Sequence, residues 1–295
     1  MEIQQARVFL AVAQDGSVSA AARRLYRTQP TVTMAIQKLE RELGTRLFER
    51  IGHGVRLTPA GHTLRASVAP LLEQWERMHG RVRTATDGVL RGAVRVAGGE
   101  GAILYLLPGP IRSFLRRHPR VELDLRQEAS GELVALLRRG SIDFAVAPLR
   151  DPPPDISFLA FRRSEYVLIA PRGHVVHRAK GLSLEQLARQ PLILPGPASG
   201  GRRSIEAAFA QSGLVPKIAL EAGGWEMVKR YAGLGLGVGI VPDFALEPDD
   251  RRLTSRRARG ILGGEIYGLL TRRGKDPSPA SRALIASILS TRAGF

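Results

Sequence analysis

Thr28–Gly44, with the sequence TQPTVTMAIQKLERELG, is the stretch that decides the fold of the N-terminal part of this 295-residue chain. Thr28 is a good helix N-cap, and Pro30 falls in the first turn, where its missing N–H needs no partner. Apolar residues recur at helical spacing and face inward, namely Val32, Ile36, Leu39 and Leu43. Gly44 ends the pattern, so the stretch predicts a helix with an apolar inner face and a polar outer face.

Two shorter helical patterns precede this stretch. The first ends at Gly16, and its apolar face comprises Ile3, Ala6, Phe9, Leu10 and Ala13. Ser17 or Ser19 can cap the second, whose inward residues are Val18, Ala21, Ala22 and Leu25. Tyr26 and Arg27 form a short turn before Thr28. Two short helices joined by a tight turn, the second opening with polar residues, predict a helix-turn-helix.

The outer face of the third helix offers side chains that suit double-stranded DNA. Gln and Thr can read base edges, whereas Lys and Arg suit phosphates. Residues 47–58, LFERIGHGVRLT, predict a strand, a turn and a second strand that form a basic wing. The residues predicted to bind DNA are Ser17, Thr28, Gln29, Pro30, Thr31, Thr33, Gln37, Lys38, Arg50, His53 and Arg56. A purely structural three-helix bundle is the alternative, but packing alone requires neither the polar opening nor the wing.

These residues carry a resemblance to a known family. The motifs AARRL, TQPTVTMAIQKLE, ELGTRLFER and VRLTPAG resemble the DNA-binding region of the LysR-type transcriptional regulators. The match covers nearly all of the first sixty positions and implies a winged helix-turn-helix over residues 1–58. One position departs from the pattern: many members carry a basic residue where Met34 follows Thr33. We therefore expect contact with the DNA backbone, and operator preference, to differ at this position.

Residues 59–86 predict one long helix, followed by a hinge over 87–92. Its apolar residues alternate steps of four and three, which is a heptad seam: Leu64, Val68, Leu71, Trp75, Met78 and Val82. Pro70 predicts a bend or a missing hydrogen bond. The seam is narrow and its flanks are polar (Glu73, Gln74, Glu76 and Arg77), which favours pairing with a second copy over packing on the chain's own core. Similarity to the family implies a homodimer through this helix, and in addition a homotetramer.

Strands and helices alternate from residue 93 onward, which predicts an α/β domain with parallel strands and helices on the sheet faces. The expected strands are 93–97, 121–128, 144–147, 166–170, 192–194, 218–221, 239–241 and 265–270. The expected helices are 103–117, 132–139, 184–188, 202–212, 225–234 and 280–289. We expect two lobes, one formed by residues 93–163 and 264–295 and the other by 164–263, with the chain crossing near 161–165 and 259–265.

The second half also resembles the family, through RHPRVELDL, GSIDFAVAP, VLIAPRGH, LEQLARQPLIL and VKRYAGLGLGVGIVP. The resemblance implies an effector-binding domain similar to two-lobed periplasmic solute-binding proteins. Ligands of such sheets lie beyond the carboxyl ends of strands, near helix N-termini. The segments 98–102, 197–203 and 223–226 meet this description, and the first two match positions where members similar to cysteine-regulon regulators hold their effector.

Ten residues of these segments are candidate effector ligands: Gly99, Glu100, Gly101, Ala102, Ser199, Gly200, Arg202, Arg203, Trp225 and Glu226. That subgroup tends to have Ser or Thr in the first segment, where this chain has GGEG, which argues against a sulfate-like anion. Ser199, Arg202 and Arg203 can bind an anionic group, whereas Glu100 can bind a cation or hydroxyls. The effector is therefore expected to be a small polar or anionic metabolite. The alternative is that these are ordinary turn glycines and solvated arginines.

Several features limit what else the chain can be. The net charge of +17 favours a polyanionic partner, yet residues 1–58 hold nine basic and five acidic residues, so the excess is not concentrated there. The chain has no cysteine and no apolar run long enough for a membrane span, and its N-terminus is a poor signal peptide, so we expect a cytoplasmic protein. His174 and His177 lack a third metal ligand. Residues 251–259 are expected to be a solvated loop.

These patterns, together with the resemblance, predict a DNA-binding transcriptional regulator that is controlled by a small-molecule effector and is neither an enzyme nor dependent on a cofactor. RNA polymerase is a further candidate partner. Two other hypotheses stay open: a metabolite-binding protein or enzyme with a vestigial DNA-binding domain, and an architectural DNA binder whose C-terminal region only oligomerises. Operator binding distinguishes the first from a regulator, and ligand binding distinguishes the second.

Overall fold

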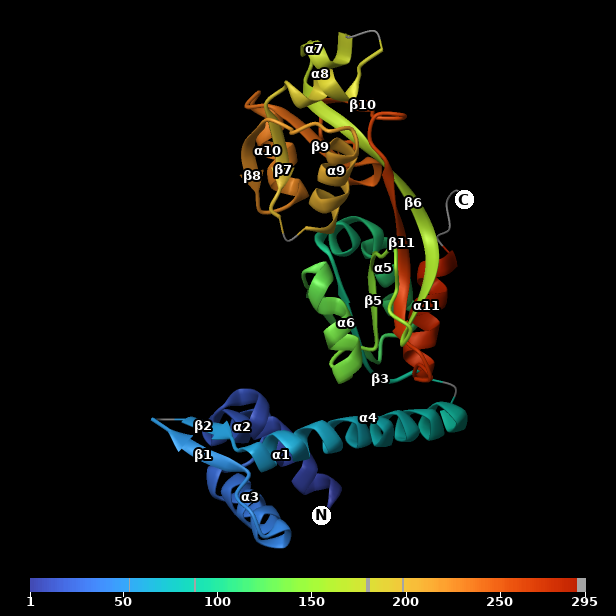
Figure 1. Ribbon diagram of the computed structural model, residues 1–295. Helices are drawn as coiled ribbons and strands as arrows, with labels where there is room; N and C mark the ends of the chain where they lie inside the picture. The colour runs from blue at the N-terminus through green and yellow to red at the C-terminus, as the bar shows by residue number, and fades with distance from the viewer. Residues whose placement is uncertain (53, 88, 179–180, 198, 291–295) are drawn as a thin grey trace. The chain divides into compact units, whose positions relative to one another are not determined.

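The computed structural model describes the chain except for residues 53, 88, 179–180, 198 and 291–295, and it leaves the side chains of 73, 76, 77 and 79–87 undescribed. The structure divides into two compact units, Met1–Gly88 and Val89–Phe295. The predicted fold class is confirmed: the first unit contains the helix-turn-helix, the wing and a long helix, and the second is a two-lobed α/β domain (Figure 1). No described helix has the length and apolarity needed to cross a membrane.

The first unit follows the predicted order closely. Its elements are α1 (Ile3–Asp15), α2 (Val18–Arg24), α3 (Gln29–Leu43), β1 (Phe48–Ile51), β2 (Gly54–Leu57) and α4 (Pro59–Asp87). The two strands pair antiparallel from Phe48↔Leu57 to Ile51↔Gly54 and form the wing. Side chains of all three short helices and of the wing share one buried core that includes Phe9, Val12, Ala21, Val32, Leu39 and Leu47.

The ends of α2 and α3 show which sequence signals operate. Ser17 caps α2, because its hydroxyl accepts a hydrogen bond from the Ala20 N–H at 3.3 Å. Thr28 occupies the N-cap position of α3, but its hydroxyl contacts that of Thr31 at 2.8 Å and caps nothing. Gly44 ends α3 in the left-handed conformation, with φ of 66°. The prediction that Leu43 faces inward is wrong, since this side chain is 42% exposed in the last turn.

Helix α4 packs on the first unit only through its N-terminal part. Gly61 permits this contact, because a Cβ there would collide with the Leu47 carbonyl oxygen. Val68 is buried, but Leu71, Trp75 and Met78 are 61%, 38% and 46% exposed on the same face of the helix. Pro70 lies inside the helix. An apolar stripe therefore continues along α4 beyond the point where the chain's own core ends.

The second unit is a mixed sheet, with strand order β4-β3-β5-β11-β6-β9-β7-β8 and β10 paired to β6. Its strands are β3 (Gly92–Gly98), β4 (Val121–Gln127), β5 (Phe144–Pro148), β6 (Ile156–Pro171), β7 (Leu192–Pro195), β8 (Ile218–Ala222), β9 (Val238–Pro242), β10 (Leu253–Arg257) and β11 (Gly264–Arg272). Strands β3, β4 and β5 are parallel, as are β7, β8 and β9. Strand β11 runs antiparallel to β5 and β6, and β6 also runs antiparallel to β9 and β10. The expectation of parallel strands therefore holds for these two sets of three and fails for β6, β10 and β11.

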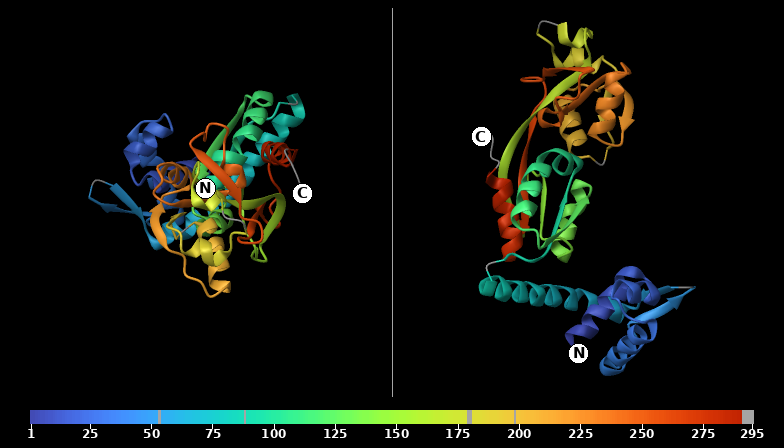
Figure 2. Two further views of the ribbon diagram at one scale, coloured as in Figure 1. Left: turned by 90° about the horizontal axis from the view of Figure 1, so that it is seen from above. Right: turned by 180° about the vertical axis from the view of Figure 1, so that it is seen from behind.

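Helices cover each half of this sheet. They are the π-helical turn η1 (Ala102–Leu106), α5 (Pro108–Arg117), α6 (Ser130–Arg139), α7 (Val175–Arg178), α8 (Leu184–Ala188), α9 (Gly200–Gln211), α10 (Trp225–Gly233), the 3-10 turn η2 (Asp243–Ala245) and α11 (Pro279–Ser290). One lobe has its core around Phe114, Phe144 and Leu284, and the other around Leu168, Ile193 and Phe209. Strands β6 and β11 run side by side from one lobe to the other (Figures 1 and 2).

The structure corrects four local expectations in this unit. Strand β6 has 16 residues, because the chain stays extended while it crosses from one lobe to the other. The single helix expected over 103–117 is broken into η1 and α5, since Pro108 supplies no N–H to continue the first turn. Residues 253–257, expected in a solvated loop, form β10 and pair with residues 167–171 of β6. The segment around His174 and His177, where no helix was expected, contains the short helix α7.

Candidate functional site

The outer face of α3 presents the polar residues expected to contact DNA. Val32, Ile36 and Leu39 are buried on the inner face. Helical geometry therefore turns the residues between them outward, and the exposed ones are Thr28, Gln29, Pro30, Thr31, Gln37 and Lys38. Thr33 is half-buried. Met34 is 68% exposed, so a large apolar side chain stands among these polar groups.

Two of these polar side chains already have partners on the first unit. The Ser19 hydroxyl donates to Gln29 Oε1 at 3.1 Å. Lys38 Nζ lies 2.9 Å from Glu2 Oε1, and this ammonium holds the pKa of Glu2 below its ordinary value. Both side chains of the ion pair are more than half exposed. Such a pair is weak in water, so a phosphate can take the place of the carboxylate.

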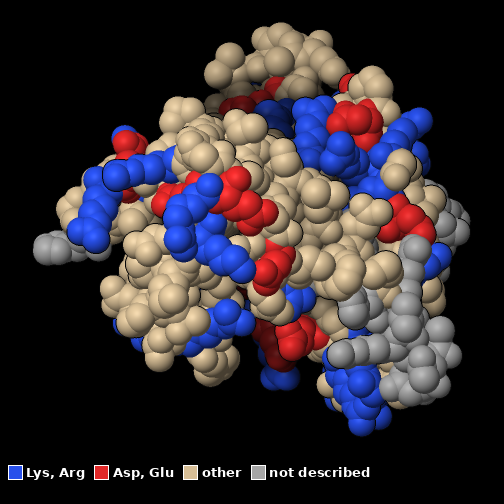
Figure 3. Space-filling model, turned by 90° about the horizontal axis from the view of Figure 1, so that it is seen from below, with Lys and Arg blue, Asp and Glu red and all other residues tan. Residues whose placement is uncertain are grey.

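Both arginines of the wing are exposed on a short hairpin. Arg50 is exposed, and Arg56 pairs with Glu49 across the two strands at 2.8 Å. His53, another residue predicted to bind DNA, lies outside the described residues. On the face drawn in Figure 3, basic side chains stand in separate groups with acidic side chains between them.

Glu40 is a positioning residue that sequence reasoning missed. Its Oε1 accepts hydrogen bonds from the backbone N–H groups of Leu47 and Phe48, at 2.7 and 3.2 Å. The carboxylate thereby ties α3 to the beginning of the wing. An acid in the last turn of the predicted helix, shortly before a predicted strand, is the only signal for this role in the sequence.

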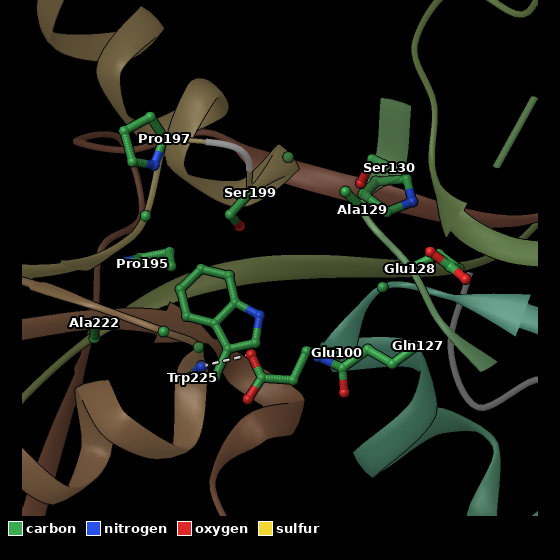
Figure 4. A pocket seen from close by; sticks show the side chains of 18 of the residues that line it. Glu100, Gln127, Glu128, Ala129, Ser130, Pro195, Pro197, Ser199, Ala222 and Trp225 are labelled. Atoms are coloured by element: carbon green, nitrogen blue, oxygen red, sulfur yellow. Dashed lines mark hydrogen bonds between the residues drawn. The ribbon is translucent and has the colours of Figure 1, made fainter. Parts of the chain in front are cut away.

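The second unit contains a cavity of about 370 Å³ between its two lobes, called the Glu100 cavity below. It brings together all three segments that the sequence singled out (Figure 4). The candidate residues that line it are Gly99, Glu100, Gly101, Ser199, Gly200 and Trp225. Further lining residues come from the end of β4 and the start of α6, namely Gln127, Glu128, Ala129 and Ser130, and Tyr267 comes from β11.

Glu100 connects the two lobes at the floor of this cavity. It lies between β3 and α5 in one lobe, and its Oε2 accepts a hydrogen bond from the Trp225 N–H in the other lobe at 2.8 Å (Figure 4). The carboxylate thus occupies the N-terminus of α10, where an anion is favoured. Gly224 allows the approach, because a Cβ there would collide with this carboxylate. Burial raises the pKa of Glu100 above its ordinary value, against the lowering effect of these N–H groups.

The N-termini of α6 and α9 face each other across the cavity. A Cβ on Gly200 would lie 3.1 Å from Ser130 Oγ, which shows how close the two ends are. Neither N-cap residue, Ala129 or Ser199, makes a side-chain capping bond. The Ser199 and Ser130 side chains point toward the space between the helices (Figure 4). First-turn N–H groups of both helices are therefore available to an oxygen acceptor.

Four of the candidate effector residues do not line this cavity. Ala102 is fully buried in a lobe core. Arg202 is 3% exposed, and its guanidinium is held by Glu206 at 2.7 Å, Glu221 at 3.3 Å and the Pro195 carbonyl at 2.9 Å. Arg202 is thus a structural residue, because the first turn of α9 directs it into the lobe. Arg203, one position later on the helix, lines a different cavity.

Glu226 is the fourth candidate residue that does not line the Glu100 cavity. It belongs to a neighbouring polar cluster, which sequence reasoning did not predict. Its carboxylate accepts a hydrogen bond from the Tyr105 hydroxyl of the other lobe. Lys229, only 5% exposed, pairs with Glu226 at 2.9 Å and with Asp250 at 3.1 Å, and its ammonium lies 5.2 Å from the centre of the Tyr105 ring. Burial raises the pKa of Tyr105, so its hydroxyl stays protonated and can donate.

Gln127, Glu128 and Ser130 are cavity residues that sequence reasoning missed. Gln127 ends β4, Glu128 follows it, and Ser130 begins α6. They therefore satisfy the same rule that singled out the other segments: the carboxyl end of a strand beside a helix N-terminus. No Lys or Arg occurs among the described residues that line the Glu100 cavity. The cavity therefore offers carboxylates, hydroxyls and backbone N–H groups. Among the described residues, no cluster of three or more His, Cys, Asp and Glu could hold a metal.

Comparisons with known proteins agree with this division of the chain. Residues 3–62 match the model of the bacterial regulatory helix-turn-helix protein, lysR family, and residues 87–293 match the LysR substrate binding domain. The HTH-type transcriptional regulator CysB of Burkholderia cenocepacia is 35% identical over 263 residues, 88% of this chain and 82% of its own. The RuBisCO operon transcriptional regulator of Allochromatium vinosum is 32% identical over 99% of this chain and 97% of its own.

Solved structures show the same architecture. CbnR, a LysR family transcriptional regulator, is 27% identical, with a TM-score of 0.68 and full coverage of both chains. A structure of full-length CbnR complexed with its target DNA also has a TM-score of 0.68, with 28% identity, 98% coverage of this chain and 99% of that chain. Full-length OxyR from Pseudomonas aeruginosa, at 23% identity and a TM-score of 0.76, covers 98% of this chain and 94% of that one and supports the fold alone.

Proposed function

The chain belongs to the LysR family of bacterial transcriptional regulators, and from this premise we propose that a small polar metabolite, held in the Glu100 cavity, modulates its action on operator DNA. The family binds DNA, and its members are regulators and not enzymes. The observation that carries the proposal is the convergence of three separate segments on one interlobe cavity. Because a ligand there touches both lobes, it can favour one lobe arrangement over another.

On DNA, α3 enters the major groove and the wing lies along the backbone. Gln29, Thr31 and Thr33 read base edges, while Lys38, Arg50 and Arg56 contact phosphates. The exposure of these residues on one folded unit supports the assignment, apart from the half-buried Thr33. CbnR, the relative whose structure includes its target DNA, shares 28% identity with the chain.

Two copies of the chain pair through α4. Leu71, Trp75 and Met78 continue the apolar stripe of this helix and are 61%, 38% and 46% exposed. A homodimer buries this stripe and places two recognition helices at neighbouring major grooves, about one helical turn apart. Pairing of dimers into a tetramer, and contact with RNA polymerase, extend the same proposal.

The lining of the Glu100 cavity narrows the class of effector. The carboxylates of Glu100 and Glu128 disfavour an anion near them, and Glu100 already occupies the N-terminus of α10. The N-termini of α6 and α9 favour an oxygen acceptor at the opposite side. We therefore expect an uncharged or zwitterionic metabolite, with amino or hydroxyl groups toward the carboxylates and an oxygen toward the two helices.

Fluorescence anisotropy with the DNA upstream of the protein's own gene tests DNA recognition. We expect sequence-specific binding at moderate salt. Gln29→Ala or Thr33→Ala should reduce the preference for this DNA over a shuffled sequence, whereas Arg50→Ala or Arg56→Ala should weaken binding to both sequences and reduce the salt slope by about one. Equal affinity of the wild type for both sequences at moderate salt would contradict the proposal.

Calorimetric titration with uncharged and zwitterionic metabolites tests the effector site. We expect a binder whose affinity falls on Ser130→Ala or Ser199→Ala, and which shifts the DNA affinity measured above. Ser113→Ala, in the same lobe as Ser130 and outside the cavity lining, is the control. A binder that is insensitive to both cavity variants would show that the effector lies elsewhere.

A further inference from the structure

A second and larger cavity, of about 960 Å³, adjoins the Glu100 cavity and shares Pro148 and Gly200 with it. Residues from both lobes and from both crossing strands, β6 and β11, line it. Its basic side chains are four arginines from four parts of the fold. They are Arg150 after β5, Arg163 on β6, Arg203 on α9 and Arg259 after β10, and we call this space the arginine cavity.

Two of these arginines form no ion pair with a described residue, so their guanidinium groups can bind an anionic ligand. Arg259 pairs with Glu165, with Nε 2.9 Å from Oε2. Arg150 and Arg163, by contrast, form no ion pair within 4 Å with any described residue, and both are exposed on the cavity wall. A guanidinium offers several N–H donors in a plane and binds carboxylates and phosphates through two of them at once.

The acids of the arginine cavity do not cancel this charge. Asp151, Glu165 and Glu265 line it together with the four arginines, so one positive charge remains even when every carboxylate is ionised. Glu265 is 7% exposed and accepts hydrogen bonds from the Ser204 and Tyr267 hydroxyls, at 3.1 and 3.3 Å. Its burial raises the pKa of the carboxyl and so favours the uncharged form.

The remaining wall is apolar. Leu149, Phe158, Ala207, Leu262 and Ile266 contribute carbon surface, and Ile266 is 41% exposed. A site with a few convergent polar groups and an apolar wall is typical of small organic ligands. An inorganic ion would use the guanidinium groups and leave this wall solvated.

We propose that the arginine cavity is a second ligand site of this regulator, which binds a small organic oxyanion, a carboxylate or a phosphate ester, between Arg150 of one lobe and Arg163 of the crossing strand. The ligand differs in charge from the effector expected in the Glu100 cavity. Arg150 belongs to one lobe, Arg203 belongs to the other, and β6 crosses between them. Binding of the anion in the arginine cavity therefore depends on how the two lobes are arranged. The site thus gives the regulator a second, anionic input at its hinge.

Isothermal titration of the full-length protein with succinate and with glycerol 3-phosphate, at constant ionic strength, tests the proposal. We expect at least one of them to bind at a single site, and the stronger of the two identifies the oxyanion as carboxylate or phosphate ester. The double variant Arg150→Gln/Arg163→Gln should weaken this binding by roughly tenfold or more for each lost guanidinium.

The matched control is Arg112→Gln/Arg116→Gln, which removes the same charge from exposed positions of α5 outside both cavities. This control should retain wild-type affinity for the anion. Three outcomes would overturn the proposal: neither anion binds the wild type at millimolar concentration, the cavity variant binds as tightly as the wild type, or the control loses affinity to the same extent. If the control loses affinity to the same extent, the anion binds through the net positive charge of the protein and not at the arginine cavity.

Discussion

The two cavities of the C-terminal unit are neighbours, yet they carry opposite chemistry. The Glu100 cavity contains two carboxylates and no basic side chain among its described lining residues, whereas the arginine cavity contains four arginines. One short stretch at the start of α9 contributes to both. Ser199 lines the first cavity, Gly200 lines both, and Arg203 lines the second, while Arg202 lies buried between two acids. Successive residues of one helical turn thus serve three different purposes.

This difference shows that the net charge of the chain is a poor guide to its ligands. A net charge of +17 favours anions in general. The lobes nevertheless place that charge unevenly, so an anion is disfavoured in one cavity and favoured in the next. Changes at single residues can test whether each cavity behaves as its lining implies.

Replacing Arg202 should have the largest effect. Arg202→Ala removes a buried guanidinium from two carboxylates and leaves the Pro195 carbonyl without its partner. We expect the free energy of unfolding of the C-terminal unit to fall by about 2–4 kcal/mol. Differential scanning calorimetry of the full chain would measure this loss.

Arg203→Ala is the matched comparison, because the same residue type lies one position further on the helix and is exposed. This change should alter stability by less than about 0.5 kcal/mol. If the two variants melt alike, the separation of a structural arginine from a cavity arginine is wrong.

Glu100 should give the next largest effect. Glu100→Ala removes the acceptor that caps the N-terminus of α10 and joins the lobes, so we expect a loss of about 1–2 kcal/mol. Glu100→Gln keeps an oxygen acceptor in the same place and should lose less. Thermal melting of the two variants measures the difference, and an equal loss would show that the bond to the Trp225 N–H contributes little.

Met34→Arg should act on DNA and leave both cavities unchanged. The new guanidinium on the outer face of α3 can bind a phosphate, so the affinity for all DNA sequences should rise and the salt slope should steepen by about one. Anisotropy titrations at several salt concentrations would show this. The anion titration of the arginine cavity, repeated on this variant, should match the wild type. A gain confined to one operator sequence would instead point to base contact by residue 34.

The pH dependence of stability should give the smallest signal. Burial raises the pKa of Glu265 above 4.5, so the folded chain keeps this proton to a higher pH than the unfolded chain. The contribution of this group to stability is therefore present below pH 4.5 and is lost as the pH rises through the raised pKa. The Glu265→Gln variant does not titrate at this position, so it does not lose this stability as the pH rises. The melting temperature of the variant minus that of the wild type should therefore increase between about pH 4 and pH 7.

Glu165→Gln is the control for sign. Arg259 lowers the pKa of Glu165, so this contribution is present above pH 4.5 and is lost as the pH falls. The melting temperature of this variant relative to the wild type should therefore fall as the pH rises from about 3 to about 5, and stay level above that. Parallel pH profiles for the two variants would contradict the assigned environments of both carboxyls.

The recognition helix and the wing were predictable because their determinants are local. Apolar spacing, the Pro30 start and the Gly44 end all lie within one stretch of the chain, and the structure places α3 at Gln29–Leu43. Leu43 departed from the pattern because the last turn extends beyond the core that the shorter helices form. The Thr28 hydroxyl can bond either to a backbone N–H of the first turn of α3 or to the Thr31 hydroxyl, and in the structure it contacts the latter. The sequence alone does not show which of the two bonds forms.

The effector region was predictable only at the level of segments. The rule for strand ends beside helix N-termini selected Glu100, Ser199 and Trp225, and these residues lie together in the structure. It gave no information about side-chain direction, so Arg202 and Arg203 looked equivalent. The sequence also could not show β10, whose residues 253–257 look like a basic surface loop until β6 is available to pair with them.

The sequence by itself determined the family, the winged helix-turn-helix and the alternation of strands and helices, because periodicity and caps act over a few neighbouring residues. Tertiary structure alone decided that Glu100 would cap α10 from the other lobe, that Arg202 would be buried and Arg203 exposed, and that four arginines would share one cavity. These outcomes depend on which elements β6 and β11 bring together across the lobes. Contacts between residues more than a hundred positions apart, such as Glu100 and Trp225, leave no periodic trace in the chain.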